Sequence, residues 1–232
     1  MYNFLLFDAD DTLLDFQKAQ LFGFMDVLIE FDIKFTQPLY DQYRDINHHL
    51  WNCFEKGQLS KTDVQKDRFT TFFELLGKNI DGEIANQVYQ KSLESQTWLI
   101  PYAIDVCMQL AKNHIITVVT NGVGQTQMKR LNTSLINPCI SNIVISENIG
   151  FSKPDVRFFD YVLNLLGCPK MEDVLLIGDS LSSDIQGAIN IGVDSCWFNP
   201  HKQPNTHNIN CNYEISDLRQ LLDIVNKPIS DL

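Results

Sequence analysis

Acidic residues, a threonine and a lysine occur in four short segments of this chain, most of which directly follow an apolar run. The segments are Asp8-Ala9-Asp10-Asp11-Thr12, Thr120-Asn121-Gly122, Lys153-Pro154-Asp155 and Gly178-Asp179-Ser180, the last of which continues to Asp184. Each segment alone is a weak signal, because acids at strand ends are common and Thr-Asn-Gly is usually a turn. Brought together, they could transfer a phosphoryl group, a reaction that uses a carboxylate nucleophile and charge stabilisation.

The acids of these segments would repel one another if they met at one place. Two like charges 4 Å apart repel by about 4 kcal/mol at an effective dielectric near 20. Asp8, Asp10 and Asp179, with Asp184 beside them, therefore call for a cation. A hard dication such as Mg²⁺, which takes oxygen ligands, is the natural choice, and Lys153 adds positive charge. Raised pKa values for some of the acids are the other solution, and the two coexist if one acid donates a proton.

The stretches around these segments alternate between strand and helix patterns. Short apolar runs predict strands at 3–8, 115–120, 142–146, 173–177 and 194–198, with a last short strand near Tyr213. Helical spacing predicts helices at 104–112, around 128–131, around 158–166, around 185–188 and at 216–226. This alternation indicates an α/β fold with a doubly wound, Rossmann-like parallel sheet. Right-handed crossovers then place the carboxyl ends of all strands along one edge, where ligands bind in such sheets.

Residues 16–98 interrupt the alternation with a purely helical pattern in which we expect no strand. Ser60 followed by Asp63 predicts a capping box, and Asp81 is expected to cap a further helix. Most aromatic residues of this stretch recur at helical spacing, so we expect them to form its own core. The chain is therefore predicted to have an α/β core of residues 1–15 and 99–232, and an all-helical domain of residues 16–98 inserted after the first strand.

The composition limits the partners. A net charge of −11 disfavours binding to a nucleic-acid polymer or an anionic membrane. No apolar run approaches the roughly 20 residues of a membrane-spanning helix, and no basic segment precedes an apolar run at the N-terminus. The six cysteines form no closely spaced pairs, which favours reduced thiols and a cytoplasmic location. We expect a small-molecule partner and a monomer or homodimer.

Taken together, the four segments resemble the motifs of the haloacid dehalogenase superfamily of phosphatases. The resemblance covers the whole core in order and spacing, and the helical insertion occupies the position of the family's type-1 cap. It implies a Mg²⁺-dependent phosphatase acting on a small phosphorylated metabolite. The residues that match the four motifs are Asp8, Asp10 and Thr12, then Thr120, then Lys153, and finally Asp179 with Asp184.

The resemblance also implies a role for each catalytic residue. Asp8 would attack phosphorus and form an aspartyl-phosphate, while Asp10 would protonate the leaving oxygen and then deprotonate the hydrolytic water. Mg²⁺ would be held by Asp8, by the main-chain carbonyl of Asp10 and by Asp179. The residues expected to bind the transferring phosphoryl group are Thr120, Asn121 and Lys153.

Three further residues are expected to support this site. Thr12 would support the first loop, and Ser180 would support the acids of the fourth segment without contacting the substrate itself. Asp184 would orient Lys153 or a metal-bound water. The alternative for Asp184 is that it simply caps the helix that follows Asp179.

The same core also occurs in proteins with other activities. Dehalogenases of the superfamily lack an acid at the position of Asp10, so this residue favours phosphate ester hydrolysis. Phosphonate cleavage needs a Schiff-base lysine from the cap, and no lysine there is marked by its surroundings. Phosphomutases match the same motifs, and that activity stays open. A non-enzymatic receiver-type switch would carry its acid pair and its phosphoacceptor on separate strands, whereas Asp8 and Asp10 share one.

The substrate is narrowed by a closer resemblance. Three stretches resemble the bacterial pyrimidine 5′-nucleotidase branch of the superfamily, namely Thr12-Leu13-Leu14-Asp15-Phe16, Cys196-Trp197-Phe198-Asn199-Pro200 and Tyr213-Glu214-Ile215. This implies a nucleoside 5′-monophosphate such as a uridine or thymidine 5′-phosphate. A sugar phosphate or another metabolite is the alternative.

Overall fold

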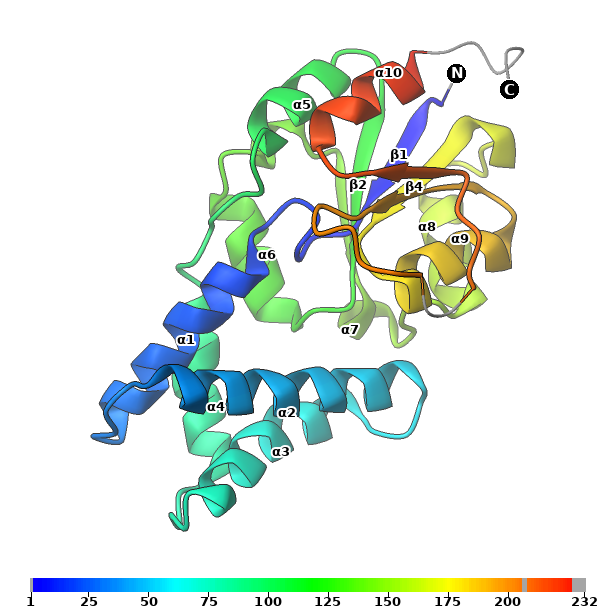
Figure 1. The fold of residues 1–232 in the computed structure, drawn as a ribbon. Coiled ribbons are helices and arrows are strands. Elements are labelled where there is room, and N and C mark those ends of the chain that lie inside the picture. The colour runs from blue at the N-terminus through cyan, green and yellow to red at the C-terminus, as the bar shows by residue number, and fades with distance from the viewer. Residues whose placement is uncertain (1, 206–207, 227–232) are drawn as a thin grey trace. The chain divides into compact units, whose positions relative to one another are not determined.

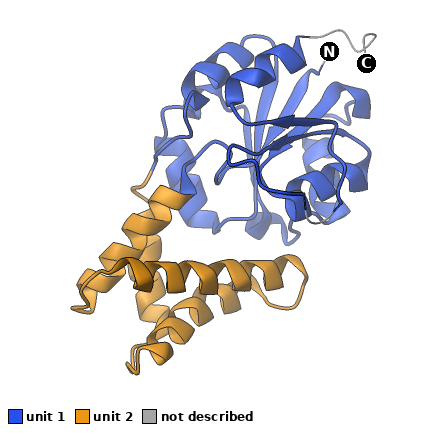
Figure 2. Ribbon diagram, viewed as in Figure 1, with its two compact units in different colours: residues 1–16, 97–232 blue, residues 17–96 orange. Residues whose placement is uncertain are grey.

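A computed structural model of the chain describes residues 2–205 and 208–226 (Figure 1). The chain divides into two compact units, Met1–Phe16 with Thr97–Leu232 and Gln17–Gln96 (Figure 2). The domain boundaries expected from sequence, after residues 15 and 98, lie within two residues of this division.

The first unit is built on one parallel sheet. Its strands stand in the order β3-β2-β1-β4-β5-β6, which confirms the predicted α/β, Rossmann-like class. The central strand β1 lies between β2 and β4, with Phe7 beside Val118 on one side and Ile177 on the other. The strands are β1 (Phe4–Phe7), β2 (Ile115–Thr120), β3 (Asn142–Ile145), β4 (Val174–Gly178), β5 (Asp194–Phe198) and β6 (Tyr213–Ile215).

Helices cover both faces of the sheet (Figure 1). Successive side chains of a strand point to opposite faces, so Leu5 and Phe7 pack in one buried cluster with α5 and α10, whereas Leu6 packs in a second cluster with α8 and α9. A strand buried on both sides is apolar at most positions, which is why β1 and β4 consist of apolar residues and glycine alone. The helices are α5 (Ala103–Leu110), α8 (Val156–Leu165), α9 (Gln186–Ile191) and α10 (Leu221–Val225).

The remaining elements of the first unit lie in the connections between its strands. Two of the helices predicted from the sequence differ from the observed elements. The helix expected at 216–226 is a 3₁₀ turn followed by α10, and the helix expected around 185–188 begins with a π-helical turn, Leu181–Ile185, before α9. The other connecting elements are α6 (Gly124–Thr133), α7 (Ser146–Ile149) and the 3₁₀ turns η1 (Asn137–Cys139), η2 (Met171–Asp173) and η4 (Leu218–Gln220).

The chain leaves the first unit and returns to it through two short backbone segments, which are hydrogen-bonded to each other. The N–H of Asp15 donates to the carbonyl of Trp98 at 2.9 Å, and the N–H of Ile100 donates to the carbonyl of Leu13 at 3.0 Å. Leu14 forms an antiparallel bridge with Leu99 between these bonds. The outgoing and returning segments are therefore held side by side within the first unit.

The second unit, the helical insertion, contains only helices and turns. Its elements are α1 (Phe16–Glu30, which starts in the first unit), α2 (Gln37–Glu55), α3 (Lys61–Leu75) and α4 (Gly82–Leu93). The predicted capping box is present, since the N–H of Asp63 donates to Ser60 Oγ at 3.1 Å and the N–H of Ser60 donates to Asp63 Oδ2 at 2.8 Å. Asp81 caps α4 by accepting from the N–H of Glu83.

Aromatic rings form the core of this insertion, as expected. Tyr43 stacks on Phe24 with ring centroids 4.6 Å apart and on Phe69 at 5.1 Å, and Phe72 meets both Phe24 and Tyr43 edge-on. All four side chains are buried. None of the helices within residues 2–205 and 208–226 combines the length and apolar character that crossing a bilayer requires.

Candidate active site

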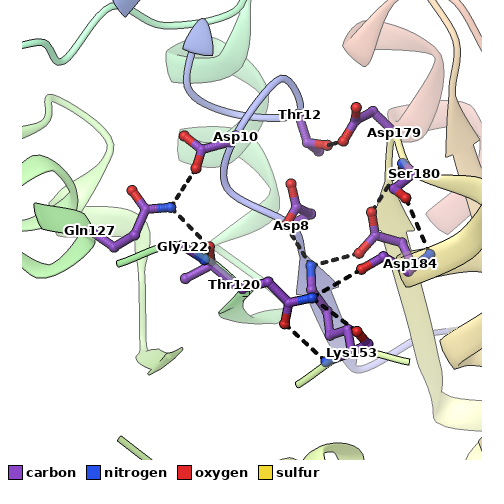
Figure 3. A network of polar contacts seen from close by, with 12 residues as sticks. Asp8, Asp10, Thr12, Thr120, Gly122, Gln127, Lys153, Asp179, Ser180 and Asp184 are labelled. Atoms are coloured by element: carbon purple, nitrogen blue, oxygen red, sulfur yellow. Dashed lines mark hydrogen bonds and ion pairs between the residues drawn. The ribbon is translucent and has the colours of Figure 1, made fainter. Parts of the chain in front are cut away.

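The four polar segments meet at the carboxyl edge of the sheet (Figure 3). Asp8 follows β1, Thr120 ends β2 and Asp179 follows β4. Because β1 pairs with β2 and β4 in register, the ends of these three strands are neighbours. Lys153 comes from the loop between α7 and α8 and reaches the same place.

Lys153 joins two of the acids. Its side chain is buried, and Nζ donates to Asp8 Oδ1 at 2.5 Å and to Asp184 Oδ1 at 2.6 Å. Burial works to lower the pKa of Lys153, but the attraction of Asp184 and Asp8 outweighs it and raises the pKa. Lys153 is therefore a buried cation held between two carboxylates.

Asp184 lies in the π-helical turn and is buried. Its Oδ2 accepts from the N–H of Ser180 at 3.1 Å, while the cap of the turn is Ser180 Oγ, which accepts from the N–H of Ser183 at 3.2 Å. Asp184 therefore contacts Lys153 directly, and a contact of Asp184 with a metal-bound water stays a prediction. This packing requires a glycine at position 178, because a Cβ there would come within 2.2 Å of Asp184 Oδ2.

Asp179 is held from both sides of its loop. Thr12 Oγ1 donates to its Oδ1 at 3.4 Å, and the indole N–H of Trp197 donates to its main-chain carbonyl at 2.8 Å. Burial raises the pKa of Asp179 well above its usual range, and the charges of Asp8 and Asp184 raise it further. The bond of Trp197 to Asp179 does not follow from local sequence, because the pairing of β4 with β5 brings the two residues together.

The acids form a cluster suited to a divalent cation. One oxygen each from Asp8, Asp179 and Asp184 lies within 4.8 Å of the others. Burial raises the pKa of Asp8 to about 8; Lys153 opposes this rise, whereas Asp184 and Asp10 add to it. Ionising the whole cluster therefore needs more positive charge than Lys153 supplies. A hard dication with oxygen ligands, such as Mg²⁺, fits this donor set.

Asp10 faces helix α6. The guanidinium of Arg130 donates from Nη1 to Asp10 Oδ1 at 2.5 Å, and Gln127 Nε2 donates to Asp10 Oδ2 at 2.7 Å. Gln127 Nε2 also donates to Thr120 Oγ1 at 2.9 Å, and the same hydroxyl accepts from the N–H of Gly122 at 3.0 Å. The two α6 side chains are 1% exposed and the Asp10 side chain 26%.

Sequence reasoning did not identify Gln127 or Arg130. The available signal was their spacing of three residues, which puts both side chains on one face of the helix that follows Thr120-Asn121-Gly122. Local periodicity does not predict which residues at the sheet edge the Gln127 and Arg130 face of α6 contacts. The packing of α6 against the sheet determines those contacts.

The side-chain amide of Asn121 binds the main chain of Lys153. Its Nδ2 donates to the Lys153 carbonyl at 2.9 Å, and its Oδ1 accepts from the Lys153 N–H at 2.9 Å. A direct contact from Asn121 to a phosphoryl group stays a prediction, as does the metal contact of the Asp10 carbonyl. What the geometry adds is that Asn121 braces the loop that carries Lys153.

The arrangement provides the parts of a two-step group transfer. Asp8 is a carboxylate beside a cation, which suits a nucleophile. Asp10 is a second, separately held carboxylate that can carry a proton. The cluster that could hold a metal and the side chain of Lys153 would stabilise charge on the transferred group.

Comparison with known proteins places this site in a family. Residues 5–198 match the family model of haloacid dehalogenase-like hydrolases. YfnB of Bacillus subtilis, a protein assigned to the HAD hydrolases, is 39% identical over 225 residues, which covers 97% of this chain and 96% of YfnB. A crystal structure of YfnB bound to magnesium has a TM-score of 0.93 at 38% identity, covering 97% of this chain and 99% of that one.

Two further relatives are named as nucleotidases. Pyrimidine 5′-nucleotidase PynA of Streptococcus pneumoniae is 34% identical over 229 residues, 98% of this chain and 97% of PynA. Pyrimidine 5′-nucleotidase YjjG of Escherichia coli is 29% identical over 226 residues, 97% of this chain and 99% of YjjG.

Proposed function

Because this chain belongs to the haloacid dehalogenase-like hydrolases, we propose that it is a Mg²⁺-dependent phosphatase that hydrolyses small phosphate monoesters through an aspartyl-phosphate on Asp8. The observation that carries the proposal is the position of Asp8, whose Oδ1 lies 2.5 Å from Lys153 Nζ within the cluster that also contains Asp179 and Asp184. Phosphoryl transfer is catalysed mainly by positioning and charge stabilisation, and this environment supplies both.

The first half-reaction transfers the phosphoryl group to the enzyme. A carboxylate oxygen of Asp8 forms a bond to phosphorus while the bond from phosphorus to the leaving oxygen breaks. Asp10, as the carboxylic acid, gives its proton to that leaving oxygen and becomes a carboxylate. The products are a free alcohol and an aspartyl-phosphate, and Lys153 Nζ is in place to bind an oxygen of the phosphoryl group.

The second half-reaction returns the enzyme to its starting state. A water oxygen forms a bond to phosphorus and the bond from phosphorus to Asp8 breaks. The carboxylate of Asp10 takes a proton from that water, so inorganic phosphate leaves and both aspartates regain their initial forms. Splitting one displacement into two in this way is the advantage of a covalent nucleophile.

Mg²⁺ is the metal that we propose for the cluster. Asp8, Asp179 and the main-chain carbonyl of Asp10 would hold it, and Asp184 would keep Lys153 in place beside it. When bound, Mg²⁺ supplies positive charge that offsets the acids and the phosphate oxygens. The raised pKa values of Asp8 and Asp179 support this assignment, because burial, and then the neighbouring carboxylates, disfavour their ionised forms, which a bound cation would stabilise.

The substrate that we propose is a nucleoside 5′-monophosphate, with a pyrimidine base. The names of PynA and YjjG, both aligned along nearly the whole chain, support this choice. A sugar phosphate, and transfer of the phosphoryl group within a sugar as in a phosphomutase, are the alternatives.

We place the activity in the cytoplasm. The six cysteines, which are all free thiols, support this location, because the cytoplasm keeps thiols reduced.

A turnover assay tests the activity. The protein is expected to release many equivalents of phosphate from p-nitrophenyl phosphate in the presence of Mg²⁺, and EDTA should abolish this release. Asp8→Asn, which keeps the side-chain shape but removes the nucleophile, should lower the rate by at least about 10³-fold. Release of no more than one phosphate per chain would instead identify a phospho-switch, and a well-folded Asp8→Asn protein with near wild-type turnover would refute the nucleophile.

A substrate panel tests the specificity. Uridine, thymidine, adenosine and guanosine 5′-monophosphates are compared with hexose and triose phosphates by kcat/KM. The proposal expects the pyrimidine nucleotides to lead. A sugar phosphate in first place, or conversion of one sugar phosphate into its isomer without phosphate release, would favour the alternatives.

A further inference from the structure

Helix α6 presents two side chains to Asp10 from one buried face. Gln127 and Arg130 are three residues apart, so they lie next to each other on the helix surface. Each of them binds a different oxygen of the Asp10 carboxylate, Arg130 at Oδ1 and Gln127 at Oδ2. Figure 3 shows Gln127 turned toward both Asp10 and Thr120.

The amide of Gln127 has only one workable orientation. Its Oε1 accepts from Arg130 Nη1 at 2.9 Å, so its NH₂ group must face the other way. The two hydrogens of that group are matched by Asp10 Oδ2 at 2.7 Å and Thr120 Oγ1 at 2.9 Å. Both polar atoms of this amide therefore have partners, which fixes the orientation of the side chain.

The surroundings are built to hold this pair of side chains. A Cβ at position 122 would come within 2.5 Å of Gln127, so the glycine of the Thr-Asn-Gly turn makes room for it. The guanidinium of Arg130 lies over the ring of Phe16, 5.7 Å from its centroid. A charged pair that is buried on one side and hydrogen-bonded on several atoms has little freedom to rearrange.

We propose that Arg130 and Gln127 are positioning residues that hold the carboxyl group of Asp10 where it can give its proton to the leaving oxygen. The proposal rests on the function of Asp10 given above. A carboxylate offers about four lone-pair sites, and α6 uses one on each oxygen. A site remains on each oxygen to carry the proton that is exchanged with substrate or water. Without α6, this partly exposed side chain would sample other rotamers, and small misplacements cost catalysis heavily.

The bond to Thr120 extends the same inference. Gln127 contacts both Asp10, the proton carrier, and Thr120, an expected phosphate ligand. The proton carrier and the phosphate-binding loop are therefore fixed to each other through one amide. A change at Gln127 should disturb the proton transfer to the leaving group, while the metal cluster at Asp8 and Asp179 stays as it is.

A leaving-group comparison separates positioning from general structural damage. Phenyl phosphate and p-nitrophenyl phosphate have similar shapes, but the leaving oxygen of phenyl phosphate is the stronger base and depends more on a proton donor. With Mg²⁺ present, kcat/KM reports phospho-enzyme formation, the step in which the leaving group departs. Arg130→Met and Gln127→Met should each lower kcat/KM about 100-fold for phenyl phosphate. For p-nitrophenyl phosphate the loss should be only about tenfold.

Matched variants control for the substitution itself. Gln125 lies exposed on the same helix, so Gln125→Met should leave both rates near wild type. Arg130→Lys keeps the charge and should restore part of the loss with phenyl phosphate. Gln127→Glu keeps the shape of the side chain and guards against a methionine variant that fails to fold. It places an acceptor against Asp10 and should show the same preference for the better leaving group.

A double-mutant cycle gives the second readout. If Gln127 acts through Asp10, then Gln127→Met should cost little further in an Asp10→Asn background with phenyl phosphate. Equal fractional losses on both esters, or a full loss from Gln127→Met on top of Asp10→Asn, would overturn the proposal. A wild-type protein that hydrolyses neither ester would instead contradict the proposed phosphatase activity, and this inference with it.

Discussion

The side-chain amide of Asn121 holds the main chain of Lys153 at both its N–H and its carbonyl, with two hydrogen bonds of 2.9 Å. Asn121 directly follows β2, whereas Lys153 lies in a loop beyond β3. The pair therefore ties this loop to the end of β2. Because Lys153 Nζ must reach Asp8 from its loop, the position of the cation depends on the amide.

Replacing Asn121 is expected to loosen this loop. Asn121→Ala removes both bonds, each worth about 1 kcal/mol, and should lower kcat/KM about tenfold, chiefly by displacing the Lys153 ammonium. Asn121→Asp retains the acceptor for the Lys153 N–H but loses the donor to the Lys153 carbonyl. Its activity should therefore fall between that of the wild type and that of Asn121→Ala. Steady-state kinetics with p-nitrophenyl phosphate measures the effect. The exposed Asn113 gives the control, and the interpretation fails if Asn113→Ala and Asn121→Ala behave alike.

Lys153→Ala is expected to reduce both stability and activity. Without the ammonium, Asp8 and Asp184 would face each other across a buried site. Breaking a buried ion pair by removing one partner costs about 3–5 kcal/mol, and each kcal/mol shifts the Tm by about 2–4 °C for a chain of this size. Thermal unfolding of the metal-free protein should therefore show a fall of roughly 10 °C.

A second substitution tests that explanation. Asp184→Asn in the Lys153→Ala background removes one of the opposed charges and should recover part of the lost Tm, without restoring activity. Lys170, whose side chain is 77% exposed, provides the control, since Lys170→Ala should change the Tm by no more than a degree or two. No recovery in the double variant would mean that lost packing, rather than charge, causes the loss of stability.

The stability of the metal-free protein should fall as the pH rises from 6 to 9. Burial raises the pKa of Asp8 from its ordinary value of 3.8 to about 8 and also raises that of Asp179, so the folded protein binds protons that the unfolded chain has released. The stability that this contributes is complete at low pH and is lost as the pH passes through the folded-state pKa. The neighbouring charges are Asp10, Asp11, Asp184 and Lys153.

Thermal unfolding in EDTA at several pH values measures this slope, and Asp8→Asn should flatten it. Mg²⁺ favours the ionised carboxylates, so its stabilising effect should grow over the same pH range. The other ionisable groups are present in both proteins, so their contributions cancel in the comparison. An unchanged slope in Asp8→Asn would place the titrating groups elsewhere.

Trp197→Phe is expected to weaken Mg²⁺ binding while leaving the fold intact. The indole N–H holds the Asp179 carbonyl at 2.8 Å, and the ring packs with Leu181 and Ile185 beside it. Phenylalanine keeps much of this apolar contact but loses the bond, so we expect about a tenfold weaker Mg²⁺ affinity by calorimetry. The exposed Trp98 serves as the control, and equal affinities in Trp98→Phe and Trp197→Phe would rule out this positioning role.

The strands of the core could be predicted because their signal is local. The run 115–120 consists of β-branched residues and the run 194–198 ends in Cys-Trp-Phe, and the observed β2 and β5 have the same bounds. The meeting of Asp8, Thr120 and Asp179 followed from parallel topology alone, since the carboxyl ends of adjacent strands share one edge.

The details that could not be predicted depend on packing across the fold. The π-helical turn Leu181–Ile185 adds a residue to the ordinary helical repeat, and it forms where Asp184 reaches Lys153. The contacts of Gln127 and Arg130 with Asp10 join residues more than 100 positions apart. No local pattern of residue types encodes such distances.

The paired backbone at Leu13–Asp15 and Trp98–Ile100 has a consequence for how this chain can be rebuilt. Its hydrogen bonds already bring together the two points where the helical insertion leaves and rejoins the α/β unit. A short turn grafted between these points would close a small loop at little entropic expense. The same junction could receive helical modules from other sources, so different insertions could be exchanged on one unchanged α/β unit.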